Sequence, residues 1–328
     1  MVPVIGFLLI ALAALLVLLG VRAWHIKNLF LRLPPVVLSG LLALVFALIG
    51  AVALIGVYRL DTPRGNPASD LRVAAAPDRL ARGAQLAHLC APCHSTTGNL
   101  PLDGGTRNFL AGLGTLYAPN LTPGGPLADW SDGEIIRAIR EGIDKNGRAL
   151  LIMPSEDFHQ MSDADVQAIV AYLRTQPSVS HATPPRTVGL IGTLLIGTGL
   201  FPTSAQAPIT QPVSSPPAAV TAEYGEYLVA ISGCRSCHGP DLSGGRADGG
   251  PPPGPNLTRI IPSWSEDDFL RTIRTGTDPQ GHRLAPDQMP WQALSAAYSD
   301  DELKAIYVYL HGLKPIERAS FLSVQVGG

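Results

Sequence analysis

Two short segments of this sequence share one pattern: two cysteines separated by two residues, then a histidine. One runs from Cys90 to His94 and the other from Cys234 to His238. The pattern is typical of covalent c-type haem attachment, in which both thiols bond to the porphyrin and the histidine reaches the iron from one side. The sequence therefore predicts two covalently attached haem c groups, held by Cys90, Cys93 and His94 and by Cys234, Cys237 and His238.

Other cysteine chemistry fits the spacing poorly. The two motifs use all four cysteines, and 144 positions separate Cys90 from Cys234, whereas paired zinc ligands usually lie about 15 to 20 residues apart. A thioredoxin-like dithiol would follow a strand and open a helix. Both motifs here follow helix-like segments and run into loops rich in glycine and proline.

Methionine is the usual second axial ligand of a haem that carries electrons. Apart from Met1, the chain has Met153, Met161 and Met289, and proline follows both Met153 and Met289. Proline biases the preceding residue toward an extended conformation, which suits a thioether presented from a loop. We expect Met153 to pair with His94 and Met289 with His238 as axial ligands. His159 and His282 lie near these loops, so a bis-histidine haem stays open as an alternative.

An internal repeat relates the two halves of the chain. The segment from Trp130 to Gly142 aligns without a gap onto the segment from Trp264 to Gly276. Each copy begins with a Ser-x-x-acid capping box, has apolar residues at helical spacing and ends at glycine, which predicts a short helix. Further on, Met161 corresponds to Tyr298 at the start of a last helix. The repeat thus favours Met153 over Met161 as the ligand.

Two segments near the N-terminus are long and apolar enough to cross a bilayer. The chain has 46% hydrophobic and 15% charged residues, and residues 1–21 and 36–58 contain no charged side chain. The loop between them has three basic side chains and no acid, so the positive-inside rule places it in the cytoplasm. We interpret residues 1–21 as a retained helix, because a cleaved signal peptide would begin with a basic region.

Each half of the remaining chain resembles a class I c-type cytochrome domain. The stretch from Tyr117 through Met153 and Pro154 to Leu173 is similar to the cytochrome c subunit of membrane-bound alcohol and sugar-acid dehydrogenases. The resemblance implies a small helical fold around each haem. The chain differs from that subunit in having two haem motifs, where the subunit has three, and an N-terminal helical hairpin.

The expected fold class is mostly α, with a two-helix transmembrane hairpin followed by two tandem class I cytochrome c domains. The apolar segment from Val188 to Phe201 is short for a crossing, and we expect it at the membrane surface or against a partner subunit. The expected divisions are a hairpin (1–60), a linker (61–78), domain 1 (79–178), a linker with the apolar segment (179–220), domain 2 (221–315) and a tail (316–328).

Iron held by histidine and methionine has no open position for oxygen or peroxide, so it transfers single electrons. We therefore expect an electron carrier, not an enzyme, in the bacterial inner membrane with its haem domains on the periplasmic side. Its partners would be the membrane and redox proteins, integral membrane subunits among them, and no nucleic acid. The alternatives are a cytochrome subunit of a membrane-bound dehydrogenase, a dihaem peroxidase and a haem-based sensor.

Overall fold

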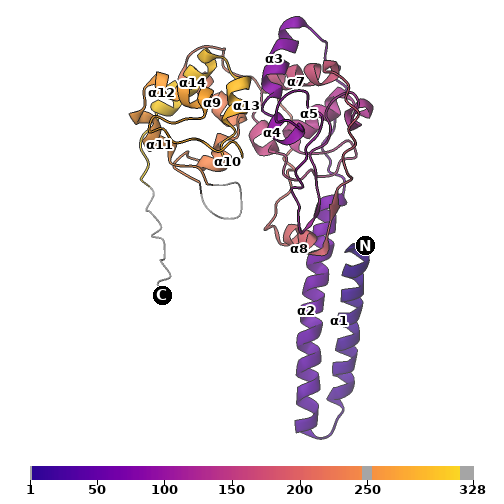
Figure 1. Ribbon diagram of the computed structural model, residues 1–328. Coiled ribbons are helices and arrows are strands. Elements are labelled where there is room, and N and C mark those ends of the chain that lie inside the picture. The colour runs from indigo at the N-terminus through magenta and orange to yellow at the C-terminus, as the bar shows by residue number, and fades with distance from the viewer. Residues whose placement is uncertain (1, 246–252, 318–328) are drawn as a thin grey trace.

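A computed structural model describes residues 2–245 and 253–317 of the chain (Figure 1). Its first two helices, α1 (Val2–Trp24) and α2 (Leu29–Asp61), form an antiparallel hairpin that projects from the rest of the molecule. The most apolar 18-residue stretches of the two helices have mean hydropathies of 3.1 and 2.7, and only 17% and 22% of these stretches are buried within the chain. Both helices are long and apolar enough to cross a membrane.

Small residues let the two hairpin helices approach closely. A Cβ added to Gly50 would lie 2.9 Å from the carbonyl oxygen of Gly6, and one added to Gly6 would lie 3.0 Å from Leu54. Packing of this kind is typical of helix pairs in membranes. Helix α2 begins before the uncharged stretch at residues 36–58 and continues through Pro34 and Pro35.

The first haem motif belongs to a group of helices that surrounds a buried core. Helix α3 crosses α7 at Gly83, where an added Cβ would lie 1.9 Å from the carbonyl oxygen of Ala168. The helices of this region are α3 (Pro77–Ala87), α4 (Ala91–His94), η1 (Pro126–Asp129), α5 (Asp132–Glu141), α6 (Ser155–Phe158) and α7 (Asp163–Thr175).

The second haem motif lies in a matching group of helices. Helix α9 crosses α14 at Gly225, where an added Cβ would lie 1.9 Å from the carbonyl oxygen of Ala305. The helices are α9 (Ala222–Ile231), α10 (Cys234–His238), α11 (Leu257–Ile260), η2 (Ile261–Ser263), α12 (Glu266–Thr275), α13 (Trp291–Ala297) and α14 (Asp300–His311).

The capping signals of the internal repeat produce the helices expected from them. Ser131 and Glu134 form a reciprocal capping box at the start of α5, and Ser265 and Asp268 form one at the start of α12. Both helices end at a glycine with a left-handed backbone. The structure thus confirms the prediction of a short helix in each copy.

The connection between the two helical groups packs onto the hairpin. Strands β1 (Gly114–Thr115) and β2 (Thr187–Val188) pair antiparallel, and α8 (Leu190–Thr198) follows and lies beside α2. An added Cβ on Gly56 would lie 2.1 Å from the carbonyl oxygen of Thr193. The Arg59 guanidinium donates to the carbonyl oxygen of Ile196 at 2.7 Å. The segment predicted at Val188–Phe201 is therefore a short helix held against α2.

A single apolar cluster contains residues of both haem regions, among them Leu86, Ile169, Leu228 and Leu303. The regions meet through α6 with α9 and through α13 with α3. In Figure 1 the second region, coloured orange to yellow, lies beside the first, above and to one side of the hairpin. The two haem regions therefore share one continuous core.

Two candidate haem sites

The first candidate site is built where α3 leads into α4. Leu86, Ala87 and Ala91 are fully buried and fix this segment to the core. His94 is itself buried, and its Nδ1 lies 2.9 Å from the carbonyl oxygen of Pro119. A carbonyl can only accept, so Nδ1 carries the proton and Nε2 keeps the lone pair that an iron needs.

The second candidate site repeats this arrangement on different residues. His238 is buried, and its Nδ1 lies 2.8 Å from the carbonyl oxygen of Pro255. The loop beside it approaches so closely that a Cβ on Gly254 would lie 2.6 Å from the imidazole. Each motif histidine thus has one ring nitrogen fixed by a proline carbonyl and the other available as a ligand.

Electrostatics at both histidines favours the neutral imidazole. Burial lowers the pKa of His94 and of His238, and the hydrogen bond to the proline carbonyl offsets only part of this effect. Neutral imidazole is the form that binds a metal, because a protonated ring has no free lone pair. Both rings are therefore held in the ligating state.

The loops after the two motifs fit closely over the second cysteine. A Cβ added to Gly105 would lie 2.3 Å from the carbonyl oxygen of Cys93, and one added to Gly245 would lie 2.1 Å from that of Cys237. Only glycine allows this approach. The two attachment segments are thus fixed by their loops in the same way.

The four cysteines form no disulfide. Burial raises the pKa of Cys90 to about 12, and burial also raises that of Cys234 to about 12. A redox dithiol needs a low thiol pKa and an electropositive setting. Two thiols beside a neutral, buried histidine, with the pKa of the first thiol raised, instead fit covalent attachment to a porphyrin. The residues present therefore match the group that the motifs imply.

The two Met-Pro segments have the same local structure. The amide of Ser155 donates to the carbonyl of Met153 at 2.8 Å, and the amide of Trp291 donates to that of Met289 at 2.7 Å. Both methionine side chains are partly buried and pack against the same apolar cluster as Cys90 and Cys234. Met161, in contrast, is only 1% exposed and lies within that core.

The two histidines near the methionine loops have other partners. The His282 side chain is 76% exposed and its Nδ1 lies 2.9 Å from Asp278. His159 is partly buried, with Nδ1 3.0 Å from the carbonyl oxygen of Arg140. The exposure of His282 and its pairing with Asp278 argue against a bis-histidine haem at the second site. The bond of His159 leaves its Nε2 free, as in the two motif histidines.

Arginines near the sites brace the helices. Arg140 pairs with Asp163 at 2.5 Å, and Arg274 pairs with Asp300 at 2.7 Å, so in each half the repeat helix is tied to the start of the last one. Arg174 Nε bonds Asp132 at 2.9 Å.

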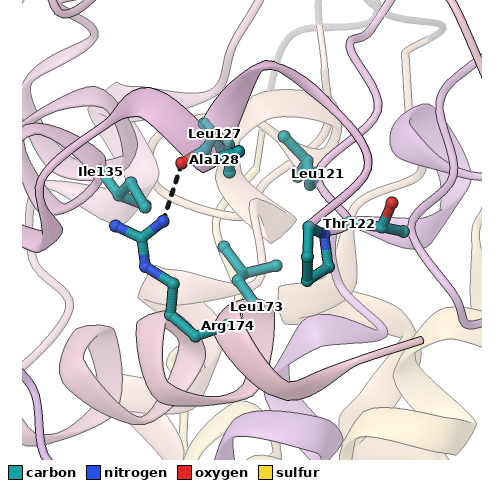
Figure 2. Close-up of a pocket in the computed structure, with 8 residues that line it drawn as sticks. Leu121, Thr122, Leu127, Ala128, Ile135, Leu173 and Arg174 are labelled. Carbon is teal, nitrogen blue, oxygen red and sulfur yellow. Dashed lines mark hydrogen bonds between the residues drawn. The ribbon is translucent and has the colours of Figure 1, made fainter. Parts of the chain in front are cut away.

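Arg174 also lines a small cavity of about 220 Å³ and donates to the carbonyl oxygen of Leu127 at 2.7 Å (Figure 2). Apolar side chains line most of this cavity, with Leu121, Ile135 and Leu173 among them. Its volume lies below the range of about 300–1,000 Å³ that is usual for ligand sites. We therefore assign it no ligand.

Sequence reasoning missed the two proline carbonyls that orient the histidines. The signal was present, because Pro119 and Pro255 each precede the repeated Asn-Leu-Thr triplet. The side chains of the triplet can be recognised in the sequence. A backbone carbonyl that accepts a hydrogen bond cannot, because every residue has one. In the described ranges 2–245 and 253–317, no group of three His, Cys, Asp or Glu residues could hold a metal ion.

Two family models match separate parts of the chain. The model described as "Cytochrome c" matches residues 80–177, and the model described as "Cytochrome C oxidase, cbb3-type, subunit III" matches residues 220–310. The matched ranges coincide with the two helical groups around the motifs.

Several curated relatives are similar to most of the chain. A nicotinate dehydrogenase subunit of Pseudomonas putida is 31% identical over 72% of this chain and 21% of its own length. The gluconate 2-dehydrogenase cytochrome c subunit of Pantoea cypripedii is 28% identical over 71% of this chain and 59% of its own length. The fructose dehydrogenase cytochrome subunit of Gluconobacter japonicus is 25% identical over 76% of this chain and 56% of its own length. The chain spans less than two thirds of the length of each of these relatives.

Proposed function

We propose that this chain carries single electrons between redox complexes at the outer face of a bacterial inner membrane. It has two cytochrome c domains with two covalently attached haem c groups. One observation carries the proposal. The arrangement of a buried histidine, a proline carbonyl and a Met-Pro loop occurs twice with nearly the same geometry. A catalytic haem would need one of the two sites to differ.

The proposed axial ligands are His94 and Met153 at the first haem and His238 and Met289 at the second. Haem iron supplies a one-electron redox couple when it is bound, and a thioether ligand raises its potential. Each imidazole is held by Nδ1–H donation, and each Met-Pro turn presents sulfur from a loop fixed to the core. Two filled axial positions favour an electron carrier over a dihaem peroxidase.

The proposed location follows from the hairpin. Arg22, Lys27 and Arg32 lie at or near the turn between α1 and α2, which has no acidic residue. The positive-inside rule assigns such a turn to the cytoplasm, so that the haem domains at the other end of α2 face the periplasm. Arg32 lies 4.7 Å from the Trp24 ring, a pairing typical of the membrane interface.

Helix α8 lies where α2 would leave the membrane toward the haem domains. It packs against the last turns of α2, and Ile191 and Leu200 are 62% and 78% exposed. Large apolar side chains beside the end of a membrane helix match the polarity of the lipid boundary. We assign this helix to the periplasmic surface of the inner membrane.

The proposed partners are membrane-bound dehydrogenase or quinol-oxidising subunits as donors, with an oxidase or a photosynthetic reaction centre as acceptor. The relatives named above as cytochrome subunits belong to gluconate and fructose dehydrogenases. Those names concern the relatives. They favour a role as a complex subunit over that of a free carrier.

The test uses the full chain purified in mild detergent. We expect two haems per chain and a reduced spectrum that carbon monoxide leaves unchanged, because both irons keep their methionine. Met153→Leu and Met289→Leu should each open one haem to carbon monoxide, while Met161→Leu, at the buried methionine, should not. Carbon monoxide binding to one haem of the unaltered chain would favour the peroxidase. Co-purifying subunits would identify the partners.

A further inference from the structure

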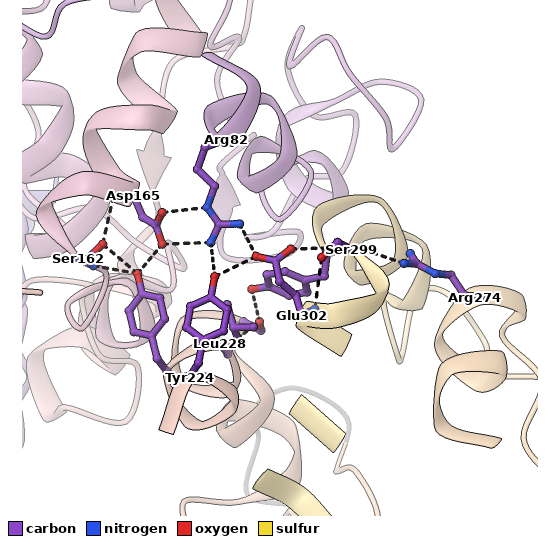
Figure 3. A network of polar contacts seen from close by, with 11 residues as sticks. Arg82, Ser162, Asp165, Tyr224, Leu228, Arg274, Ser299 and Glu302 are labelled. Carbon is purple, nitrogen blue, oxygen red and sulfur yellow. Dashed lines mark hydrogen bonds and ion pairs between the residues drawn. The ribbon is translucent and has the colours of Figure 1, made fainter. Parts of the chain in front are cut away.

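A buried polar network joins the two haem domains (Figure 3). At its centre is Arg82 on α3, whose Nε bonds Asp165 of α7, in its own domain, at 2.9 Å. The Nη1 of the same guanidinium bonds Glu302 of α14, in the second domain, at 2.5 Å. The side chains of both acids are only 11% exposed and that of Arg82 is 21% exposed.

Two tyrosines of α9 complete the network. Tyr227 donates from its hydroxyl to Asp165 at 2.6 Å, across the domain boundary, and Tyr224 donates to Glu302 at 3.0 Å within its own domain. Arg82 also donates to the Tyr224 hydroxyl at 3.3 Å. Both carboxylates are thus bonded from both sides of the boundary, which satisfies buried charges that would otherwise be costly.

A second contact joins the two candidate haem sites themselves. Asp157, on the short helix α6 that follows the Met153 loop, accepts a hydrogen bond from Ser236 Oγ at 2.8 Å. Ser236 lies between the two cysteines of the second motif. A Cβ on the neighbouring Gly233 would lie 3.2 Å from the same carboxylate. The methionine loop of the first site therefore touches the attachment segment of the second.

Apolar packing alone would not fix the relative orientation of the domains. The shared apolar cluster resists separation, but contacts of this kind have no direction and tolerate sliding. Hydrogen bonds between ions depend on geometry, and a guanidinium that bonds two carboxylates fixes the angle between the helices that carry them. The linker at 202–221 is hydrogen-bonded to the first domain at Ser204, Gln206 and Val213. These bonds hold the linker to that domain and do not set the angle of the second.

We propose that Arg82 is a positioning residue that holds the two haems of this chain at one distance and angle, so that electrons pass between them across the contact of Asp157 with Ser236. In this step a ferrous iron gives one electron to a ferric iron, and no bond is made or broken. The inference rests on the proposed carrier function. It adds that electrons pass from one haem of the chain to the other, and that this transfer depends on Arg82, which is not one of the proposed axial ligands.

The first test compares Arg82→Gln with Arg259→Gln in the full chain. Arg259 is a matched control because its side chain is 58% exposed and bonds Glu317, which is 77% exposed and follows the second domain, so this pair does not join the two domains. One haem is reduced by a light-triggered donor, and the redistribution of the electron is followed by absorbance. The distance between the two ferric haems is measured by their magnetic dipolar coupling.

We expect Arg82→Gln to increase the fraction of chains with separated domains about 10- to 100-fold, because the loss of one partner leaves buried charges uncompensated. Electron redistribution should slow and the distribution of haem distances should broaden, while each haem keeps its axial ligands and absorption spectrum. Arg259→Gln should match the unaltered chain. Glu302→Gln should have a smaller effect in the same direction, because the amide still accepts one bond.

Unchanged redistribution and an unchanged distance distribution in Arg82→Gln would overturn the inference and leave the carrier function intact. Loss of an axial ligand in this variant would also overturn it, because Arg82 would then act on a haem site. Carbon monoxide binding to the unaltered chain would instead contradict the carrier function. Should Arg82→Gln fail to fold, Tyr227→Phe provides the same comparison with the hydroxyl's bonds to Asp165 and Ser162 removed.

Discussion

The crossing of α3 and α7 predicts that Gly83→Ala destabilises the first haem domain. A Cβ at Gly83 would lie 1.9 Å from the carbonyl oxygen of Ala168 and 2.6 Å from its carbonyl carbon, whereas ordinary contacts begin at 3.4 Å. The two helices would have to separate by about 1.5 Å at the crossing. The obstacle is backbone inside a helix, which cannot turn aside as the end of a side chain can.

Two opposing effects set the change in the free energy of unfolding. Overpacking of a tight contact costs about 1–3 kcal/mol and occasionally more. Alanine is a better helix former than glycine by about 1 kcal/mol. Because the clash is with backbone, we take the upper end of the first range and expect a net loss of about 2 kcal/mol, equal to a fall of about 8–16 °C in Tm for a domain of roughly 100 residues.

The assay is thermal unfolding of the purified chain with both haems attached, followed by far-UV circular dichroism. Gly225→Ala is a matched second test, because its Cβ would lie 1.9 Å from the carbonyl oxygen of Ala305. Gly65→Ala is the control, because no heavy atom lies within 4 Å of its added Cβ. A Tm of Gly83→Ala within about 1 °C of the unaltered chain would refute the argument from packing.

Three further predictions use other assays. Replacing both Cys90 and Cys93 by alanine should remove both thioether bonds of the first haem, so that denaturing mass spectrometry finds one haem per chain; two haems would contradict the role of these cysteines. Burial raises the pKa of Asp157 against the opposing hydrogen bond from Ser236. The folded chain therefore binds this proton more tightly than the unfolded one, and stability should fall as pH rises from about 4 through the raised value. Asp157→Asn should reduce that slope in urea unfolding series, and an equal slope would exclude the carboxyl as its source. Lys27→Cys should react with a membrane-impermeant thiol reagent only in inverted vesicles, and reaction in intact cells would reverse the proposed topology.

Much of the fold could be predicted from the sequence because its signals are local. The capping serines and terminal glycines of α5 and α12 act within a few residues, so the repeat determined both helices. The resemblance to cytochrome c domains, the mostly helical fold and the two haem c groups are confirmed by the two family models. The ligand assignments, the domain limits and the side of the membrane remain predictions.

Features built from distant residues had no comparable signal. Arg82 and Glu302 are 220 positions apart, and nothing near either residue specifies the other. The uncharged stretch predicted at residues 36–58 begins directly after Pro34 and Pro35, yet α2 passes through both prolines. Membrane helices accept proline, because neighbouring groups can satisfy the freed carbonyls. Where α8 docks was equally undetermined, since its contacts depend on glycines in another helix.

The two close crossings at Gly83 and Gly225 place Arg82 and Tyr224 at equivalent positions, one residue before each glycine. These two side chains touch each other at 3.3 Å. If the halves descend from a duplicated unit that once paired with itself, an arginine on both sides would have set two positive charges face to face. One arginine opposite one tyrosine removes that repulsion. The halves are thus complementary rather than interchangeable, and two copies of the first half alone would bring two arginines together.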